Sequence, residues 1–258
     1  MHYKNVLITG ASSGIGREFA KIFAKEKNNL ILVARNREKL EDLREDLLEE
    51  GVQITIIEKD LAQPNAGQEL YDILRDKDIR VNILINNAGF GLSGYIVDIP
   101  VEKQLEMIQL NIVTLTHLTH LFVQDMIADR YGRILNVGSI ASFVSTPSLG
   151  TYAATKAYVL SFSEALNTEL RMHDNVHVTA LCPGPTKTKF SERASMKGRG
   201  RELFDEYGMS AKDVAKHGYR AMKNKKAVTI AGTQFRVLVW ATRFLPRSLV
   251  QKSVTKLT

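Results

Sequence analysis

The sequence predicts an α/β protein built on a doubly wound parallel sheet of about seven strands in a single domain. Three observations support this prediction. Apolar runs alternate with amphipathic helical stretches, a glycine-rich turn joins the first run to the first helix, and no linker-like stretch divides the 258 residues. Repeated strand–helix–strand units form right-handed crossovers, which place parallel strands side by side in one sheet.

Seven short runs rich in Val, Ile and Leu are typical of strands that are covered on both faces. We expect these strands at residues 5–9, 29–34, 53–58, 82–86, 133–138, 176–182 and 227–231. Apolar residues at helical spacing predict helices at 15–27, 37–50, 65–76, 101–128, 152–171 and 211–223. Ser210, with Asp213 three residues later, has the pattern of a helix cap for the last of them.

The composition is ordinary for a globular protein, with 44% hydrophobic and 24% charged residues. Cys182 is the single cysteine, so no intramolecular disulfide can form; we expect a buried thiol and a cytoplasmic location. We expect neither a signal peptide nor a transmembrane helix, because no apolar run is long enough to span a bilayer. His117 and His120 lie three residues apart without a third ligand near them, so no metal site is expected.

The turn from Thr9 to Gly16 follows the first strand and leads into the first helix. A glycine turn at this place lets the backbone approach a pyrophosphate, and the helix N-terminus supplies free N–H groups and a partial positive charge. The spacing is G-x-x-x-G-x-G, which differs from the commoner G-x-G-x-x-G. The residues expected to contact the phosphates are Gly10, Ser12, Ser13, Gly14, Ile15 and Gly16.

The end of the second strand indicates which nicotinamide nucleotide binds. In dinucleotide-binding folds an Asp or Glu at this place binds the ribose hydroxyls of NAD. This chain has Ala34 there, followed by Arg35, and Arg17 lies just past the glycine turn. Guanidinium groups pair well with phosphates, so the pattern favours NADP(H) over NAD(H). The alternative is that Arg35 is only a surface charge.

Three further strand ends are expected to contact the cofactor. A carboxylate that follows the third strand can accept a hydrogen bond from an adenine amino group, and small residues after the fourth strand allow the backbone to lie against a ribose. The backbone after the sixth strand can meet the nicotinamide carboxamide, to which a threonine there can also bond. The residues concerned are Asp60, Leu61, Asn87, Ala88, Gly89, Pro183, Gly184, Thr186 and Thr188.

Tyr152 and Lys156 lie four residues apart in a helical pattern and therefore share one helix face. A phenol has an ordinary pKa of about 10, and a nearby ammonium group lowers the pKa by stabilising the phenolate. Ser139 ends the fifth strand, where its hydroxyl can hold a substrate oxygen beside the tyrosine. Asn111 is a polar residue in an apolar helical run; it either holds a water molecule on Lys156 or is a core asparagine bonded to backbone.

These motifs together resemble the short-chain dehydrogenase/reductase family over residues 5 to about 190. Six motifs occur in the family's order, and the thirteen-residue gap from Ser139 to Tyr152 also fits. The resemblance implies a Rossmann-type sheet, a nicotinamide cofactor and a catalytic tetrad of Asn111, Ser139, Tyr152 and Lys156. The stretch from Val33 to Asn36 looks like NADPH-preferring reductases, and the basic apolar C-terminal part resembles the branch with 17β-hydroxysteroid and long-chain 3-oxoacyl reductases.

The resemblance implies that NADPH delivers hydride to a carbonyl carbon while Tyr152 protonates the developing alkoxide. Ser139 then orients the substrate oxygen, Lys156 holds the ribose and keeps Tyr152 acidic, and Asn111 supports a water relay. Pocket residues are expected at Phe90, Leu92, Phe143, Leu149 and Phe190, which favours a hydrophobic ketone or its alcohol as substrate. The alternative function is a non-catalytic NADP-binding regulatory protein on the same fold.

Two segments depart from the repeating pattern of the catalytic domain, which we place at residues 1–232. Residues 189–209 are polar and are expected to form either a substrate lid or a disordered surface loop. Residues 233–258 form a basic extension in which Val237, Trp240 and Phe244 recur at helical spacing.

The apolar face of this extension packs on its own domain or a second subunit, docks peripherally on a membrane surface, or binds an acidic partner. Nucleic acid is not expected, because no recognisable nucleic-acid-binding fold accompanies the basic stretch. The resemblance also implies a homodimer or homotetramer that forms through the helices expected at 101–128 and 152–171.

Overall fold

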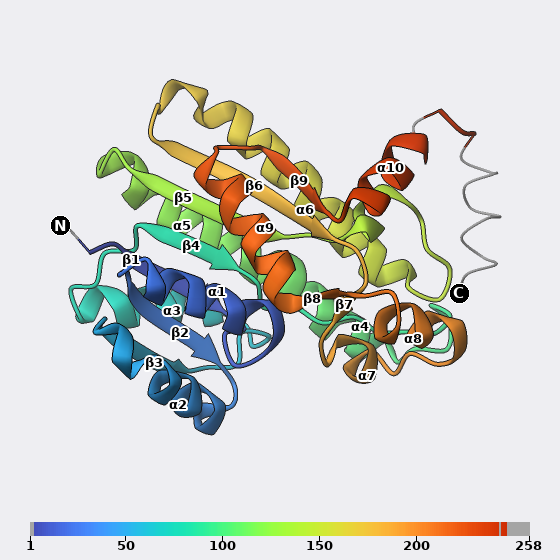
Figure 1. Cartoon of the computed structure of the whole chain (residues 1–258), viewed down its shortest axis with the longest axis horizontal. Helices are drawn as coiled ribbons and strands as arrows, with labels where there is room; N and C mark the ends of the chain where they lie inside the picture. The colour runs from blue at the N-terminus through green and yellow to red at the C-terminus, as the bar shows by residue number, and fades with distance from the viewer. Residues whose placement is uncertain (1–2, 243, 247–258) are drawn as a thin grey trace.

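Seven parallel strands form the central sheet of the computed structural model, which describes residues 3–242 and 244–246 (Figure 1). Their order across the sheet is β3-β2-β1-β4-β5-β6-β9, so the strand order reverses between β1 and β4. The strands are β1 Asn5–Thr9, β2 Asn29–Ala34, β3 Ile54–Glu58, β4 Ile83–Asn86, β5 Gly132–Val137, β6 Val176–Pro183 and β9 Val228–Ala231. This arrangement confirms the predicted fold class. In such sheets ligands bind beyond the carboxyl ends of the strands where the order reverses.

Helices cover both faces of the sheet, because each face presents its own apolar side chains (Figure 1). On one face, α1 (Gly14–Lys25), α2 (Arg37–Asp46) and α9 (Ala211–Lys223) pack over a core that includes Phe19, Leu40 and Val214. On the other face, α3 (Ala66–Asp76) and α5 (Leu115–Ala128) pack through Leu70 and Phe122. The long helix α6 (Gly150–Glu169) lies beside β6. Cys182 is fully buried, as predicted.

The helix predicted over 101–128 changes its winding near the site. It consists of α4 (Val101–Ile108), a π-helical segment η2 (Gln109–Thr114) and α5. Single π-helical turns inside helices occur frequently at functional sites. Asn111 lies in this segment and is completely buried, so the irregular winding belongs to the part of the helix that carries the predicted site residue.

Residues 189–209 have regular structure, so the disordered surface loop, one of the two alternatives for this polar stretch, is wrong. They contain two short helices, α7 (Phe190–Arg193) and α8 (Gly198–Asp205), held between strands β7 (Thr186–Lys187) and β8 (Met209–Ser210). The two strands pair in parallel and form a second, small sheet. Phe190 and Phe204 supply apolar contacts to a cluster that contains Tyr152, which explains why this polar stretch has regular structure.

Three shorter helices follow α2, β5 and α6, respectively. They are η1 (Leu48–Glu50), η3 (Ile140–Phe143) and η4 (Leu170–Met172). The last described helix, α10 (Thr233–Thr242), follows β9 and packs on β9 and η3. Ser210 caps α9 as predicted: its hydroxyl accepts a hydrogen bond from the backbone N–H of Asp213 at 3.0 Å.

Candidate active site

The glycine turn has the geometry that a phosphate-binding loop requires. Gly10 and Gly14 have φ angles of +65° and +57°, a region that L side chains rarely adopt. Ser13 precedes α1 without a side-chain cap, so the first N–H groups of the helix have no side-chain partner there. A Cβ atom on Gly14 would lie 3.1 Å from the Cγ2 atom of Thr188, which brings two predicted cofactor contacts to one place.

Asn87 and Thr9 lock this turn to the end of β4. The side-chain Nδ2 of Asn87 donates to the carbonyl oxygens of Thr9 at 2.9 Å and Gly10 at 3.1 Å. The hydroxyl of Thr9 accepts from the backbone N–H groups of Asn87 and Ala88, at 3.0 Å each. The amide side chain of Asn87 therefore fixes the ends of β1 and β4 against each other. Ala88 and Gly89 follow with small side chains or none, so the backbone after β4 stays accessible.

A groove of about 630 Å³ opens beside the glycine turn. Basic side chains outnumber acidic ones along it, which suits a ligand that carries phosphates. Arg17 is paired with Asp46 at 2.6 Å, whereas Arg35 is exposed and has no ion pair within the described residues. The lining residues are Ser12, Ser13, Gly14, Arg17, Lys39, Asp42, Lys187, Thr188, Lys189 and Asp205.

Asp60 and Leu61 follow β3 as predicted; Asp60 makes a local bond and Leu61 a long-range one. The Oδ1 atom of Asp60 accepts from the backbone N–H of Ala62 at 3.0 Å, which is the arrangement of a turn-forming aspartate. The carbonyl of Leu61 accepts from the hydroxyl of Thr114 at 2.7 Å. Since Thr114 ends the π-helical segment, this bond fixes the 60–61 backbone relative to the helix that carries Asn111.

Two of the four predicted catalytic residues, Asn111 and Lys156, meet beside Gly89, and Tyr152 lies next to the lysine. A Cβ atom on Gly89 would lie 2.9 Å from Oδ1 of Asn111 and 3.5 Å from Nζ of Lys156. Nζ of Lys156 lies 5.8 Å from the centre of the Tyr152 ring. Tyr152 and Lys156 are both buried, at 8% and 6% exposure. The helical spacing of the tyrosine and the lysine therefore places them in one enclosed site. Ser139, which follows β5, reaches the same site, since its hydroxyl lies beside the phenol of Tyr152.

Backbone bonds orient the lysine and the serine. Lys156 donates from Nζ to the carbonyl of Val137 at 2.8 Å, and its own carbonyl accepts from the hydroxyl of Ser142 at 2.7 Å. The hydroxyl of Ser139 accepts from the N–H of Ala141 at 3.1 Å and caps η3. Ser142 was not predicted as a site residue. It lies three residues after Ser139 in a reciprocal capping box, a spacing that is visible in the sequence.

The pKa of Tyr152 differs in direction from the sequence-based expectation. Burial raises the pKa of Tyr152 to about 12, and the nearby hydroxyl of Ser139 partly opposes this change. Burial also lowers the pKa of Lys156 to about 8. The expected lowering of the Tyr152 pKa is wrong for the protein alone, because removal of the phenol from water is the largest effect on its pKa.

We predict that Lys156→Met makes the folded state relatively more stable at neutral pH. The ordinary pKa of Lys156 is 10.5, and the folded value is about 8. Below pH 8 the fold bears the full cost of burying an ammonium, about 3 kcal/mol at 1.36 kcal/mol per pKa unit. As pH rises from 8 to 10.5, the folded state has released a proton that the unfolded state keeps, so the wild type gains stability.

Denaturant unfolding of wild type and Lys156→Met across this pH range checks the prediction. The free energy of unfolding of the wild type, taken relative to the variant, should rise through the window and level off above the ordinary pKa of 10.5. Use of the difference removes the contribution of lysines that both proteins share. A difference that stays flat from pH 7 to 11 would contradict the burial of a charged amine at this position.

Asn111 connects the loop after β4 to the helix that carries Tyr152. Its Oδ1 accepts from the N–H of Phe90 at 3.2 Å, and its Nδ2 donates to the carbonyl of Phe90 at 2.9 Å and to the hydroxyl of Thr155 at 3.1 Å. Thr155 in turn donates to the carbonyl of Tyr152 at 2.7 Å. This chain of bonds fixes the helix turn on which Tyr152 stands. Thr155 was not predicted as a site residue; it is buried and lies one residue before Lys156, on the inward face of the helix.

Apolar side chains enclose the phenol of Tyr152. The ring of Phe190 lies 5.3 Å from the Tyr152 ring, and Phe204 stacks behind Phe190 at 5.6 Å. The same cluster holds the predicted pocket residues Phe90, Leu92 and Leu149, with Met107 and Met196 beside them. Phe143, also predicted to line the pocket, packs instead against the cluster of Leu160, Ala180 and Cys182.

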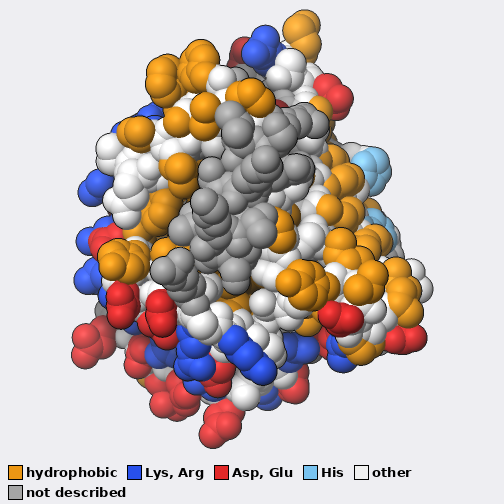
Figure 2. All heavy atoms as spheres, turned by 90° about the vertical axis from the view of Figure 1, so that its right-hand side faces the viewer, with side chains coloured by type: hydrophobic (Ala, Val, Ile, Leu, Met, Phe, Trp, Pro, Cys, Tyr) orange, Lys and Arg blue, Asp and Glu red, His pale blue; other side chains and the backbone are white. Residues whose placement is uncertain are grey.

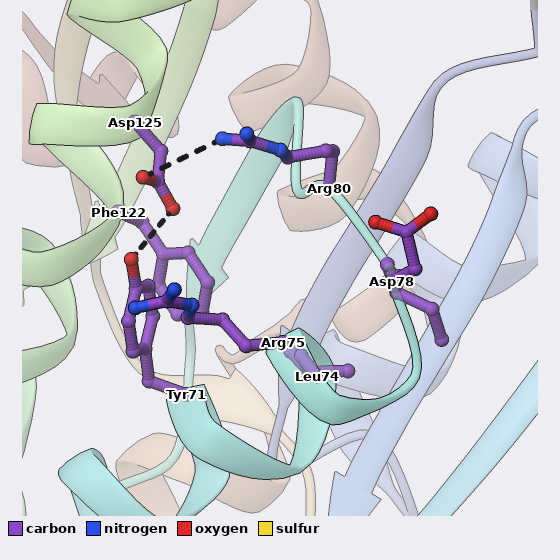
Figure 3. Close-up of a pocket in the computed structure, with 8 residues that line it drawn as sticks. Tyr71, Leu74, Arg75, Asp78, Arg80, Phe122 and Asp125 are labelled. Carbon is purple, nitrogen blue, oxygen red and sulfur yellow. Dashed lines mark hydrogen bonds and ion pairs between the residues drawn. The ribbon is translucent and has the colours of Figure 1, made fainter.

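A second hollow, of about 300 Å³, lies away from these residues between α3 and α5 (Figure 3). Figure 3 shows Asp125 between Tyr71 and Arg80: its carboxylate accepts from the Tyr71 hydroxyl at 3.0 Å and pairs with Arg80 at 3.7 Å. Arg75 lies 5.9 Å from the centre of the Tyr71 ring. None of the predicted site residues lines this hollow, and the carboxylate of Asp125 already pairs with the guanidinium of Arg80.

The histidines and the cysteine form no metal site in the described part of the chain. His120 bonds to Gln124 at 2.8 Å, which leaves it in a surface role as predicted. Burial raises the pKa of the Cys182 thiol to about 12, so this cysteine is a poor nucleophile.

Comparison with known proteins agrees with this geometry. The model of a protein family described as short chain dehydrogenase matches residues 4–198. The chain is 32% identical to "Dehydrogenase/reductase SDR family member 7B" of Bos taurus over 93% of its own length and 77% of that protein. It is also 32% identical to a "Very-long-chain 3-oxoacyl-CoA reductase" of Anas platyrhynchos, over 72% of its own length and 61% of the relative.

Two solved structures share the fold over almost their full length. A short-chain dehydrogenase from Sphingobium yanoikuyae in complex with NADPH superposes with a TM-score of 0.82 at 32% identity, covering 93% of this chain and 94% of that one. A short chain dehydrogenase/reductase from Burkholderia phymatum in complex with NAD gives a TM-score of 0.83 at 25% identity, covering 92% of each chain. One neighbour binds NADPH and the other NAD.

Proposed function

Because this chain belongs to the short-chain dehydrogenase family of oxidoreductases, we propose that it is an NADPH-dependent reductase that converts a hydrophobic ketone to an alcohol. The observation that carries the proposal is the convergence of Tyr152, Lys156 and Asn111 around Gly89, beside a glycine turn shaped for a dinucleotide. The nicotinamide nucleotide supplies the hydride when bound. Everything else in the reaction is positioning and proton transfer by this chain.

In this proposal Tyr152 donates the proton to the substrate oxygen, because its phenolic hydroxyl is enclosed beside Lys156. Ser139, at the rim of the same site, orients the substrate oxygen and stabilises the charge that develops on it. Nζ of Lys156 donates to the carbonyl of Val137 and lies 5.8 Å from the centre of the Tyr152 ring. It can therefore stabilise the phenolate that remains once Tyr152 has given its proton to the substrate. Asn111 and Thr155 hold the helix turn that aims the phenol, and the proposed water relay through Asn111 depends on the same contacts.

The cofactor-binding residues remain those named from the sequence, on the glycine turn and at the ends of β2, β3, β4 and β6. The groove beside Ser12 and Thr188 supports phosphate binding, since its lining is rich in lysine and arginine. Arg35 is exposed at the end of β2 and carries no ion pair in the described residues, so it is available to a 2′-phosphate. These features support NADPH over NADH.

We predict that Arg35→Ala weakens NADPH binding and leaves NADH binding nearly unchanged. Loss of one charge-assisted hydrogen bond of 1.5–3 kcal/mol corresponds to a loss of roughly 10–150-fold in affinity. Titration of NADPH and NADH by fluorescence measures both dissociation constants. Arg37→Ala is the matched control, because Arg37 is close by, exposed and paired with Glu41 at 3.3 Å. Equal losses for the two cofactors would contradict the assignment of Arg35 to the 2′-phosphate.

The substrate class follows from the surroundings of Tyr152. The cluster around the phenol consists of Phe, Leu, Met and Ala side chains, and Phe190 lies directly on the ring. Such a lining favours an apolar ketone over a charged one. We place the α7–α8 segment as the lid over this site, because Phe190 of α7 and Phe204 of α8 both pack against the cluster that contains Tyr152.

The experiment that tests the proposal follows the absorbance of NADPH with a panel of apolar ketones of increasing chain length, together with small polar ketones. Consumption of NADPH with the apolar members supports the reductase. Tight NADPH binding without turnover over the whole panel would instead support the non-catalytic regulator. We also propose a homodimer or homotetramer that forms through α5 and α6, where Tyr158 of α6 bonds to Thr116 of α5 at 2.9 Å on an exposed face.

A further inference from the structure

Helix α10 presents large apolar side chains to solvent. Phe235 and Val239 fix the helix from its inner side: a Cβ atom on Gly184 would overlap the Phe235 ring, and Val239 is 5% exposed. The other large apolar side chains of this region are each at least half exposed. They are Val237, Leu238, Trp240, Phe244 and Leu245, and we call them the α10 surface. The apolar face with Val237 and Trp240, for which packing on its own domain was one of the alternatives, is therefore not covered by the described residues.

The α10 surface lies at the same edge of the sheet as the active site. Helix α10 follows the carboxyl end of β9, and its Phe235 contacts Gly184 of the loop that ends β6. A second exposed apolar group follows the carboxyl end of β4, where Tyr95, Ile96 and Val97 precede α4. Because the strands are parallel, both groups lie beside the rim of the site. Figure 2 shows hydrophobic side chains gathered across this side of the molecule.

The charge of the C-terminal segment indicates what covers such a surface. From Gly232 to Thr258 the sequence contains five basic residues and no aspartate or glutamate. Exposed apolar side chains together with cations are the combination that binds the interface of an anionic bilayer. A second copy of this chain carries the same basic segment without a carboxylate, so it lacks the charge complementarity that an anionic bilayer offers. The basic residues are Arg236, Arg243, Arg247, Lys252 and Lys256.

We propose that the α10 surface docks on an anionic lipid bilayer and that the mouth of the active site then faces the membrane. In this proposal the α10 surface rests on the bilayer interface. None of the helices in the described part of the chain has the length and apolar character needed to cross a bilayer. Resting on the proposed function, the docked enzyme takes apolar ketones that partition into lipid. Trp240 and Phe244, whose rings lie 4.7 Å apart, are the aromatic anchors at the interface.

Trp240 makes a direct test possible, because it is the single tryptophan of the chain. Vesicles of phosphatidylcholine with phosphatidylglycerol are added to the full chain, and vesicles of phosphatidylcholine alone serve as the comparison. We expect a blue shift of Trp240 emission and quenching by brominated acyl chains with the anionic vesicles. Raised salt should weaken both signals, since it screens the cations from the lipid charge.

A matched pair of double variants separates docking through the α10 surface from nonspecific adsorption of the protein to vesicles. Trp240→Ser with Phe244→Ser should lower sedimentation with anionic vesicles on the order of tenfold or more, because both anchors are lost. Leu48→Ser with Met172→Ser is the control: both side chains are exposed, at 66% and 88%, and both lie before strands, at the opposite edge of the sheet. The control should sediment like the wild type.

The proposal would be overturned if the wild type did not bind anionic vesicles, or if both double variants bound them equally. It would also be overturned if the α10 variant differed from the wild type only in its oligomeric mass, measured by light scattering without lipid. The last would identify a second copy as the occupant. Turnover of a water-soluble ketone without vesicles is measured in parallel. If docking fails while turnover persists, only the docking proposal is lost; if vesicles bind while no ketone is reduced, the proposed function fails and docking stands.

Discussion

Tyr152→Phe should lower kcat by about 10²–10⁴-fold, the usual contribution of a general acid, while NADPH binds with nearly unchanged affinity. The substitution removes one hydroxyl and keeps the ring that packs against Phe190 at 5.3 Å. Because Tyr152 is 8% exposed, no water molecule from bulk solvent easily replaces the lost proton donor. Steady-state kinetics with an apolar ketone and a fluorescence titration of NADPH measure the two effects separately.

Tyr158→Phe is the control for this experiment. Tyr158 lies on the same helix, α6, but is 37% exposed and bonds through its hydroxyl to Thr116. The change in chemistry is identical, so only the position relative to Lys156 differs. We expect kcat for Tyr158→Phe to stay near the wild-type value. If Tyr152→Phe retained wild-type turnover, or if both variants lost it equally, Tyr152 would not be the proton donor.

The fold could be predicted because its determinants are local. The runs at 5–9 and 29–34 coincide with β1 and β2 as observed, since uninterrupted Val, Ile and Leu residues are needed wherever both faces of a strand are covered. The order of the motifs also predicted that Tyr152, Lys156 and Asn111 lie near each other. In the structure Asn111 and Lys156 both lie beside Gly89, and Tyr152 lies next to Lys156. Helical spacing and strand ends are properties that a sequence displays directly.

The parts that escaped prediction depend on contacts between distant segments. The pKa of Tyr152 rises because the ring is enclosed by residues such as Phe190, and the degree of enclosure is not a property of the Tyr-x-x-x-Lys spacing. Residues 189–209 have a polar sequence, yet Phe190 and Phe204 anchor two helices there on the catalytic cluster. In the C-terminal extension, helical spacing alone did not distinguish the inner side of Phe235 and Val239 from the exposed side of Trp240. Positions 243 and 247–258 of that extension lie outside the described residues.

Gly16→Ala should weaken both the fold and the binding of NADPH, because one atom would enter the contact between β1 and β4. A Cβ atom on Gly16 would lie 2.5 Å from Nδ2 of Asn87 and would also overlap the carbonyl oxygen of Gly10. Neither neighbour can move freely, since Nδ2 of Asn87 holds the carbonyls of Thr9 and Gly10. Overpacking of this kind typically costs 1–3 kcal/mol, which denaturant unfolding would detect.

The matched control for Gly16→Ala is Gly200→Ala, where the nearest atom to an added Cβ is the flexible methyl of Met196 at 3.5 Å. That variant should bind NADPH like the wild type and should be at least as stable, because Gly200 lies in helix α8 and alanine is the better helix former. In Gly16→Ala the shifted Gly10 backbone also moves the turn on which the phosphates would rest, so the loss of affinity should exceed any effect on kcat at saturating cofactor. Unchanged NADPH affinity in a folded Gly16→Ala protein would show that the dinucleotide does not rest on this turn.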